Sequence, residues 1–523
     1  MYKLVFILLP LFVISNCYKI LICNPKFGFS HVNFFGQIAD ILHDAGHDVT
    51  VLSVNMDLSI KHPGAYKAKI INYPADEEVV KIYSNRTYLN NLWETTDDSW
   101  TQLEGLDIWA DTIYKQGLKL FGDTNLSTTM MNEKFDFAIT EAFGHYFIGL
   151  FKIWKIEKYA VAASTAMLDT NYDEFGLSFP TSYVPTAMKY FSEDITFKER
   201  FINQIDHWST ILYTYLKWRK PTLYKEFNKR YGKGFFDPRH SLSQASYIFI
   251  NSNPYFDFPG PKAPKMIEVG GIGVHDTKPL DDYWDEILSK REYNVIISFG
   301  TVMKSKLMPK KKREGILEVI KNMPHITFIW KYEEPNDGTN TDIGNLFLTK
   351  WFPQSDMLND KRISLFITHG GAGSITEIAF RGVKTLAIPI MSDQFKNSKL
   401  IEKYKIGKVL NKNYLEDPEI LKRYIEDILY SHEYSRNAKL LSNILKERPI
   451  SSKELLIKHV EFACKYGRLP MLELPSIDMN FITYHNLDVI LSIIGGILLV
   501  IYLLRKIYLN LITVKDYMIK KTQ

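Results

Sequence analysis

Residues 366–377 read Phe366-Ile367-Thr368-His369-Gly370-Gly371-Ala372-Gly373-Ser374-Ile375-Thr376-Glu377. The apolar run before the glycines predicts a buried strand over 364–368, and the residues after them predict a helix over 374–380. Glycines at a strand end that opens a helix leave backbone N–H groups unpaired, and the helix dipole adds about half a positive charge there. We therefore expect this turn to bind a diphosphate, although a single turn of this kind serves tight strand–helix packing equally well.

The same alternation of strand and helix extends outward from this turn and recurs near the amino terminus. In the second half, strands are predicted over 294–299, 326–330, 346–349 and 385–388, and a helix over 310–322. In the first half the prediction is a strand over 19–23, a loop over 24–29, a helix over 32–45 and a strand over 49–54. Both patterns are typical of doubly wound α/β units.

We therefore predict an α/β protein with two Rossmann-like, doubly wound domains that face a cleft. A stretch rich in proline and glycine, 253–273, indicates the approach to a linker, which places the domains at 18–275 and 276–470. The long middle of the first domain is rich in tryptophan and tyrosine and shows no clear periodicity, so its elements stay unassigned.

Composition excludes several classes of protein. Of 523 residues, 46% are hydrophobic and 24% are charged, which is globular usage rather than that of a disordered chain. The net charge of +5 is too small for a protein that neutralises phosphate backbones, so no nucleic-acid partner is expected. A mean hydropathy of −0.15 excludes a membrane protein with many spans but allows one or two.

The two ends of the chain indicate a secreted or membrane-anchored protein. Residues 1–17 resemble a signal peptide, with a first buried strand as the alternative. Near the other end, a juxtamembrane segment (471–487) precedes an apolar transmembrane helix predicted over 488–504, for which a buried core helix is the alternative. The basic tail, 505–523, favours a type I topology with the domains in the lumen and the tail in the cytoplasm.

Short sequence motifs agree with a lumenal location of the domains. Asn85 and Asn125 begin Asn-x-Ser/Thr sequons, which are candidate glycosylation sites in a lumenal domain. Lys520 and Lys521 stand fourth and third from the carboxyl terminus, an arrangement similar to the di-lysine retrieval signal of type I proteins of the endoplasmic reticulum. The sequence therefore predicts a single-pass protein of the endoplasmic reticulum membrane.

Three motifs in order are more specific than the glycine turn alone: Trp351-Phe352-Pro353-Gln354, the stretch 366–377, and Pro389-Ile390-Met391-Ser392-Asp393-Gln394. Together they resemble the nucleotide-binding signature of the UDP-glycosyltransferases, the family that includes the UDP-glucuronosyltransferases. The similarity covers nearly the whole chain. It implies a GT-B fold, in which the second domain holds the UDP-sugar and the first holds the acceptor.

The resemblance also implies roles for single residues of the second domain. Trp351 would stack on uracil, Gln354 would contact the nucleoside, and Glu377 would bind the ribose. The phosphates would be held by Thr301, His369, Gly371 and Ser374, and the sugar hydroxyls by Asp393 and Gln394. Lys384 stands where the family usually has proline; it lies in the loop before a strand, so we expect altered loop stiffness rather than lost binding.

His31 follows the first strand, where the family carries its catalytic histidine. A lone histidine in a loop is usually a polar surface residue, but the carboxyl end of a strand faces the expected crevice. The resemblance assigns the partner carboxylate to Glu141, and Asp136 is the competing candidate. The implied reaction is the inverting transfer of glucuronic acid or glucose from UDP to a small lipophilic acceptor, with His31 as general base.

The chain contains no Asp-x-Asp sequence, so we expect no essential metal and no cofactor besides the UDP-sugar co-substrate. Two alternatives remain at this stage. Gly371, Gly373 and Asp393 mimic part of a dinucleotide-binding fingerprint, which would suit an oxidoreductase. The second alternative is a membrane-anchored binding protein without turnover. The sequence leaves open which sugar and acceptor are used and whether the chain forms an oligomer.

Overall fold

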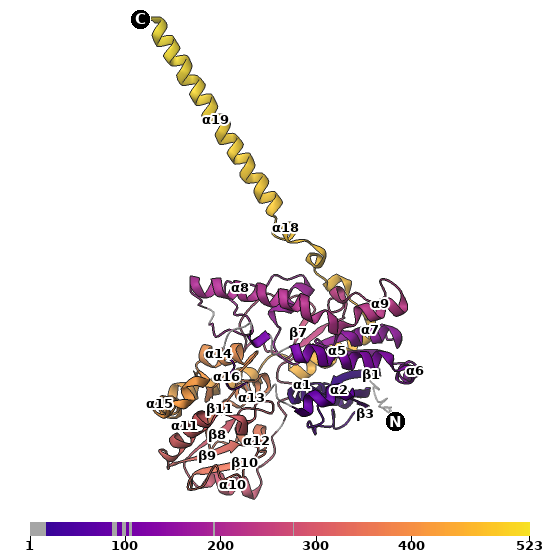
Figure 1. Ribbon diagram of the computed structural model, residues 1–523, viewed down its shortest axis with the longest axis vertical. Helices are drawn as coiled ribbons and strands as arrows, with labels where there is room; N and C mark the ends of the chain where they lie inside the picture. Colours follow the sequence, from indigo (N-terminus) through magenta and orange to yellow (C-terminus); the bar gives the residue numbers. More distant parts are fainter. Residues whose placement is uncertain are drawn as a thin grey trace, which may run out of the picture.

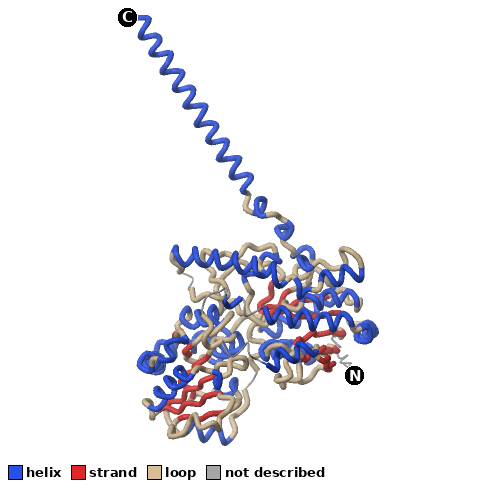
Figure 2. The backbone as a smooth tube through the Cα atoms, in the orientation of Figure 1, coloured by secondary structure: helices blue, strands red, loops and turns tan. Residues whose placement is uncertain are grey.

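The computed structural model describes residues 17–85, 92–96, 101–103, 107–191, 194–275 and 277–522. Two parallel sheets, each covered by helices, form the body of the molecule, and one long helix projects from it (Figure 1). The strands fall into two separate groups (Figure 2), as two doubly wound domains require. The predicted signal peptide lies outside the described residues, except for Cys17.

The first sheet has seven parallel strands in the order β3-β2-β1-β4-β5-β6-β7. Its strands are β1 (Lys19–Pro25), β2 (Asp48–Asn55), β3 (Lys69–Pro74), β4 (Phe137–Glu141), β5 (Tyr159–Ala163), β6 (Ile248–Ile250) and β7 (Met266–Glu268). The central pair sets up the site, because Ile20 lies opposite Phe137 and Cys23 opposite Thr140. The carboxyl ends of β1 and β4 therefore meet at one edge of the sheet.

The second sheet has six parallel strands in the order β10-β9-β8-β11-β12-β13. Its strands are β8 (Tyr293–Ser298), β9 (Ile326–Lys331), β10 (Leu346–Thr349), β11 (Ile363–Thr368), β12 (Thr385–Ala387) and β13 (Gly407–Val409). The strand order reverses between β8 and β11: β9 and β10 follow on one side of this pair, and β12 and β13 on the other. Ligands bind at such switch points in open α/β sheets.

Helices cover both sheets. Those within the first-domain sequence are α1 (Phe29–Asp44), α2 (Glu77–Asn85), α5 (Asp107–Gly122), α6 (Thr124–Glu133), α7 (His145–Ile153), α8 (Phe197–Tyr213) and α9 (Tyr224–Tyr231). Those within the second-domain sequence are α10 (Asp282–Ser289), α11 (Lys310–Lys321), α12 (Gln354–Asn359), α13 (Ala372–Arg381), α14 (Gln394–Lys403), α15 (Pro418–Leu429) and α16 (His432–Lys446). Most present one buried apolar face, as α1 does with Phe35, Ile38 and Leu42.

Two predictions need correction. α1 begins at Phe29 rather than at residue 32, so His31 lies in its first turn and not in a loop; β1 continues to Pro25, and only three residues separate the two elements. The stretch 253–273, predicted as an approach to a linker, also contains β7, the last strand of the first sheet, which is too short at three residues to show a period. Helix α17 (Ser452–Tyr466), assigned by sequence to the second domain, packs against the first sheet and α1 through Leu456 and Val460.

The chain ends in a short helix, α18 (Phe481–Tyr484), and the long helix α19 (Leu487–Thr522). None of the residues of α19 is buried, and an 18-residue window in it has a mean hydropathy of 2.6, so it is long and apolar enough to span a membrane. The helix contains the predicted span, 488–504, and continues through the predicted tail, which the sequence did not indicate.

Candidate functional site

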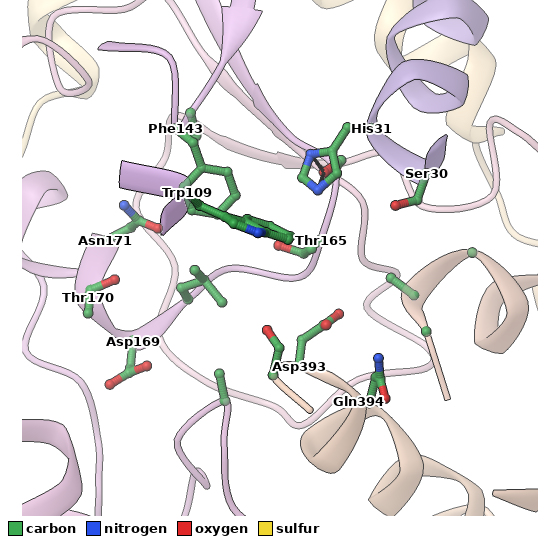
Figure 3. Close-up of a pocket in the computed structure, with 18 of the residues that line it drawn as sticks. Ser30, His31, Trp109, Phe143, Thr165, Asp169, Thr170, Asn171, Asp393 and Gln394 are labelled. Carbon is green, nitrogen blue, oxygen red and sulfur yellow. Dashed lines mark hydrogen bonds between the residues drawn. The ribbon is translucent and has the colours of Figure 1, made fainter. Parts of the chain in front are cut away.

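One cavity of about 2080 Å³ is lined by residues of both domains. Its lining residues lie largely in loops and helix starts that follow the carboxyl ends of the strands in the two sheets. Figure 3 shows His31 on the side of the first domain and Asp393 and Gln394 across the cavity from it. The residues predicted for the donor site all line this cavity: Thr301, Trp351, Gln354, His369, Gly371, Ser374, Glu377, Asp393 and Gln394.

The turn after β8 fits closely against His369 at the end of β11. Gly300 has φ +82°, and a Cβ atom built there would lie 2.6 Å from a carbon of the His369 imidazole. Burial and the nearby Lys331 ammonium lower the pKa of His369 to about 4. The imidazole is therefore neutral at physiological pH, and its ring hydrogen-bonds to the Ser298 backbone.

Gln354, Ser374 and Glu377 form one hydrogen-bonded group. The Gln354 amide donates to the Ser374 hydroxyl at 3.1 Å and to a Glu377 carboxylate oxygen at 2.6 Å. Burial raises the pKa of Glu377 to about 7, against the opposing effect of the Gln354 hydrogen bond. The group links α12 to α13, whose amino terminus follows the glycines at 370 and 371.

Trp351 presents its indole to the cavity with 56% of its surface exposed. Phe29 of the first domain packs edge-on against it, with ring centroids 5.6 Å apart. Lys331 at the end of β9 places its ammonium 4.4 Å from the indole centroid and donates to the Gly300 carbonyl at 2.9 Å. Lys331 could not be identified from the sequence, because one lysine at a strand end carries no signal until the fold places it here.

Thr301 directly follows Gly300, and Asp393 and Gln394 open α14. The Gln394 side-chain oxygen accepts from the backbone N–H groups of Ile390 and Met391, at 2.9 and 3.2 Å, which fixes the side chain in place. Burial raises the pKa of Asp393, while its carboxylate accepts from the Asn397 amide at 2.8 Å.

On the other side of the cavity, His31 and Glu141 are in contact. The His31 Nδ1 atom lies 2.7 Å from Glu141 Oε2, and the Glu141 side chain is fully buried behind the imidazole. Glu141 Oε1 accepts the Ala142 N–H at 3.1 Å, so both carboxylate oxygens have a partner. The Ser164 hydroxyl lies 2.6 Å from the same Nδ1 atom. Ser164 was not among the residues predicted from the sequence, because it lies just after β5, a short strand that no pattern indicated.

The competing carboxylate, Asp136, lies at the opposite end of β4. Its side chain is exposed and accepts the Lys19 N–H at 2.8 Å. Because β4 runs from Phe137 to Glu141 toward the cavity, Asp136 is on the far edge of the sheet from His31. Glu141 is therefore the carboxylate that the fold brings to the histidine.

The cavity beyond His31 is lined by part of the unassigned middle of the chain. Trp109 of α5 and Phe143 lie near His31 (Figure 3), and the Phe27 ring lies beside the imidazole, with centroids 4.4 Å apart and the planes tilted by 50°. Asp169, Thr170 and Asn171 form a polar border on this part of the cavity. This space can hold a mainly apolar molecule with some polar groups.

Other predicted features fall outside the cavity. Lys384 precedes β12, as expected, and its ammonium donates to the Leu429 carbonyl at the end of α15. Asn125 is exposed in the first turn of α6, and Asn85 is exposed at the end of α2, although the rest of its sequon lies outside the described residues. Over the described ranges, no three histidine, cysteine or acidic side chains are grouped as a metal site would require.

Comparison with known proteins gives a consistent result. The family model described as "UDP-glucoronosyl and UDP-glucosyl transferase" matches residues 19–522. The chain is 29% identical over 502 residues to UDP-glucuronosyltransferase ugt-46 of Caenorhabditis elegans, a provisional name, with 94% of this chain and 93% of the relative covered. It is 25% identical to UDP-glucuronosyltransferase 1A8 of Rattus norvegicus, with 91% and 89% covered.

Solved structures show the same fold. The glycotransferase of kitacinnamycin matches with a TM-score of 0.57 and 13% identity, over 88% of this chain and all of that one. LpCGTa, solved in complex with UDP, matches with a TM-score of 0.52 and 15% identity, over 86% and 99%. With the match over residues 19–522, the chain belongs to the UDP-glucoronosyl and UDP-glucosyl transferase family and is a UDP-sugar-dependent hexosyltransferase with the GT-B fold.

Proposed function

We propose that this enzyme transfers glucuronic acid or glucose from UDP to a hydroxyl group of a small lipophilic acceptor, with inversion at the anomeric carbon. The observation that carries the proposal is the 2.7 Å contact between His31 Nδ1 and Glu141 Oε2, on the same cavity as the donor residues. A histidine paired with a buried carboxylate can remove a proton from a hydroxyl, which is a poor nucleophile until that proton leaves.

Glu141 would act by orienting the imidazole. Its carboxylate accepts from Nδ1–H, which leaves Nε2 as the basic nitrogen, and it stabilises the imidazolium that forms. The Ser164 hydroxyl, 2.6 Å from Nδ1, would help to hold the same ring orientation. Glu141 and Ser164 are thus proposed as positioning residues and His31 as the catalytic base.

The donor would lie on the second domain. Uracil would stack on Trp351, the nucleoside would contact Gln354, and the ribose hydroxyls would donate to Glu377. The phosphates would be bound by Thr301, His369, Ser374 and the backbone at Gly371, and the sugar hydroxyls by Asp393 and Gln394. Because Gln354 already holds Glu377 at 2.6 Å, the nucleoside site is assembled before the donor binds.

In the reaction, the acceptor oxygen forms a bond to the anomeric carbon while the bond from that carbon to the diphosphate oxygen breaks. The acceptor proton goes to His31, and the electron pair of the broken bond leaves with UDP. The amino terminus of α13, with the Ser374 hydroxyl as a donor, would stabilise the charge that develops on the diphosphate. His31 approaches from the side opposite UDP, so the sugar inverts. We propose that no metal ion takes part.

The proposed location is the membrane of the endoplasmic reticulum. Cleavage after residue 17, a span over 488–504 and a cytoplasmic tail would place both domains in the lumen, where Asn85 and Asn125 would be open to glycosylation. Apolar acceptors concentrate in membranes, so an enzyme anchored beside the bilayer meets them there.

The membership of the chain in a UDP-sugar transferase family contradicts both alternatives from the sequence, the dinucleotide oxidoreductase and the binding protein without turnover. The partial fingerprint at Gly371 and Gly373 is explained by the turn that opens α13.

The direct test is to incubate the full-length protein in membranes with UDP-glucuronic acid or UDP-glucose and a panel of phenols, with and without a chelator. We expect transfer from one of the donors, inverted anomeric configuration by NMR, and activity largely retained with the chelator. Absence of transfer from both donors or a retained configuration would contradict the proposal. Complete loss of transferase activity in the presence of the chelator would refute the proposal that no metal ion takes part.

A further inference from the structure

Helix α8 and the turn that follows it carry an exposed apolar stripe. The exposed large side chains recur every three or four residues, which places them along one side of the helix. The stripe consists of Phe197, Phe201, Ile202, Ile205, Trp208, Leu212, Tyr215 and Leu216. Phe197 is 75% exposed and Trp208 59%.

The opposite face of α8 is polar and buried. Asn203 donates from its amide to the carbonyls of Thr181 and Val184, and Asp206 accepts from the Thr186 hydroxyl at 2.6 Å. His207 contacts Asp169 at 2.9 Å. These bonds fix the rotation of the helix, so the apolar stripe cannot turn inward without breaking them.

This arrangement is inverted relative to a helix on a water-soluble protein, which buries its apolar side. A contiguous exposed apolar surface of this kind marks a contact with another protein or with lipid. Exposed Lys198, Arg200 and Lys217 border the stripe. Aromatic and aliphatic side chains on one face, flanked by basic ones, are typical of helices that lie in a membrane interface.

The position of α8 favours lipid over a second protein. The helix crosses the side of the body from which α18 and α19 depart (Figure 1). The juxtamembrane segment also lies beside this region: the Tyr484 hydroxyl accepts the Ser178 N–H at 3.1 Å, and Phe481 and Tyr484 line the same cavity as Trp208 and Ile211. The stripe therefore continues the surface at which the chain enters the membrane.

We propose that the stripe of α8 lies in the lipid interface of the membrane that α19 spans. Its inner face, with Gln204, His207 and Thr210, lines the cavity, so docking places the acceptor side of the cavity next to the bilayer. Lipophilic acceptors then enter from the lipid rather than through water. This last consequence rests on the proposed function, whereas the docking itself does not.

Docking is tested by fluorescence quenching of the full-length protein in vesicles made with lipids brominated on the acyl chains. Trp208 is the tryptophan of the stripe, and α19 contains none. We expect quenching of the wild-type protein and loss of most of that quenching in Trp208→Phe, which keeps an aromatic ring. Absence of quenching, or equal quenching in the variant, overturns the proposal.

A matched pair of variants tests the consequence for acceptors. Leu212 in the stripe and Leu440 on α16 are 57% and 58% exposed, so Leu212→Glu and Leu440→Glu insert a charge at equal exposure. We expect Leu212→Glu alone to raise KM several-fold for an acceptor dissolved in the vesicles, with kcat and the KM of a water-soluble acceptor unchanged. If Leu212→Glu instead changes the oligomeric state of the protein while its contact with lipid stays intact, the stripe binds a second copy of the chain. That result would refute lipid docking. If neither donor is used at all, the proposed function fails while the quenching result still stands.

Discussion

His31 and the donor site belong to different domains, so its imidazole can be removed without touching the UDP site. His31→Ala should lower kcat by about 10²- to 10⁴-fold, because general-base catalysis is lost. UDP affinity, measured by calorimetry, should stay unchanged. Glu141→Ala should lose less activity, and Asp136→Ala should act mainly on folding, since Asp136 lies on the far edge of the sheet. Near-normal turnover of His31→Ala at neutral pH would contradict the mechanism.

Trp351 tests the position of the base. Stacking on an aromatic side chain contributes about 1 to 3 kcal/mol per base, so Trp351→Ala should weaken UDP binding about five- to a hundredfold. Trp351→Phe keeps a flat ring, so its affinity for UDP should lie between those of the wild-type protein and the alanine variant. Calorimetric titration with UDP measures this series. An unchanged affinity in the alanine variant would move the base away from the indole.

We expect donor binding to depend on pH because of Glu377. In the proposed site its carboxylate form accepts the ribose hydroxyls. Burial raises the pKa of Glu377 to about 7, so protonation would remove this acceptor as the pH falls through 7. Affinity for UDP-glucose should therefore decrease between pH 7.5 and about 6. Glu377→Gln should bind more weakly and with a flatter pH profile over the same range. His369, with a pKa of about 4, stays neutral throughout and does not contribute.

At the scale of elements, the turn after β8 depends on a glycine. Gly300→Ala would place an alanine at φ +82° with its Cβ against the His369 ring, so the free energy of unfolding should fall by about 1 to 3 kcal/mol. Gly373→Ala, in the first turn of α13 with open space around the new Cβ, should be neutral or stabilising by up to about 1 kcal/mol. Denaturant titration of both variants measures the difference, and equal stability would show that this turn tolerates a side chain.

The elements that could be predicted are those with a strong local pattern. The strand at 346–349 has the bounds of β10, and the predicted helix at 310–322 differs from α11 by one residue. Strands β5 and β6 are short and almost wholly buried, so they show no alternation, and β7 has only three residues. Helix α8 lies in the middle of the first domain, whose elements the sequence left unassigned, and many of its apolar residues face outward.

For the whole molecule, the proposed location can be tested at the two terminal lysines, Lys520 and Lys521. Lys520→Ser with Lys521→Ser should let the protein reach later compartments, because the di-lysine signal is removed while the anchor remains. Processing of the glycan at Asn125, or at Asn85, measured by endoglycosidase resistance, reports this movement. Tail residues that a protease reaches only after the membrane is permeabilised would reverse the topology and contradict the location.

The two α/β halves, the glycine turn at 370–373 and the ordered donor motifs could be predicted from the sequence alone, because these depend on contacts between residues close in the chain. The sequence could name His31 and Glu141 only through the family resemblance. The tertiary structure decided their contact, since residues 110 positions apart meet only when β1 pairs with β4. Ser164, Lys331 and the docking of α17 on the first sheet likewise arise from long-range packing, for which no local spacing gives a signal.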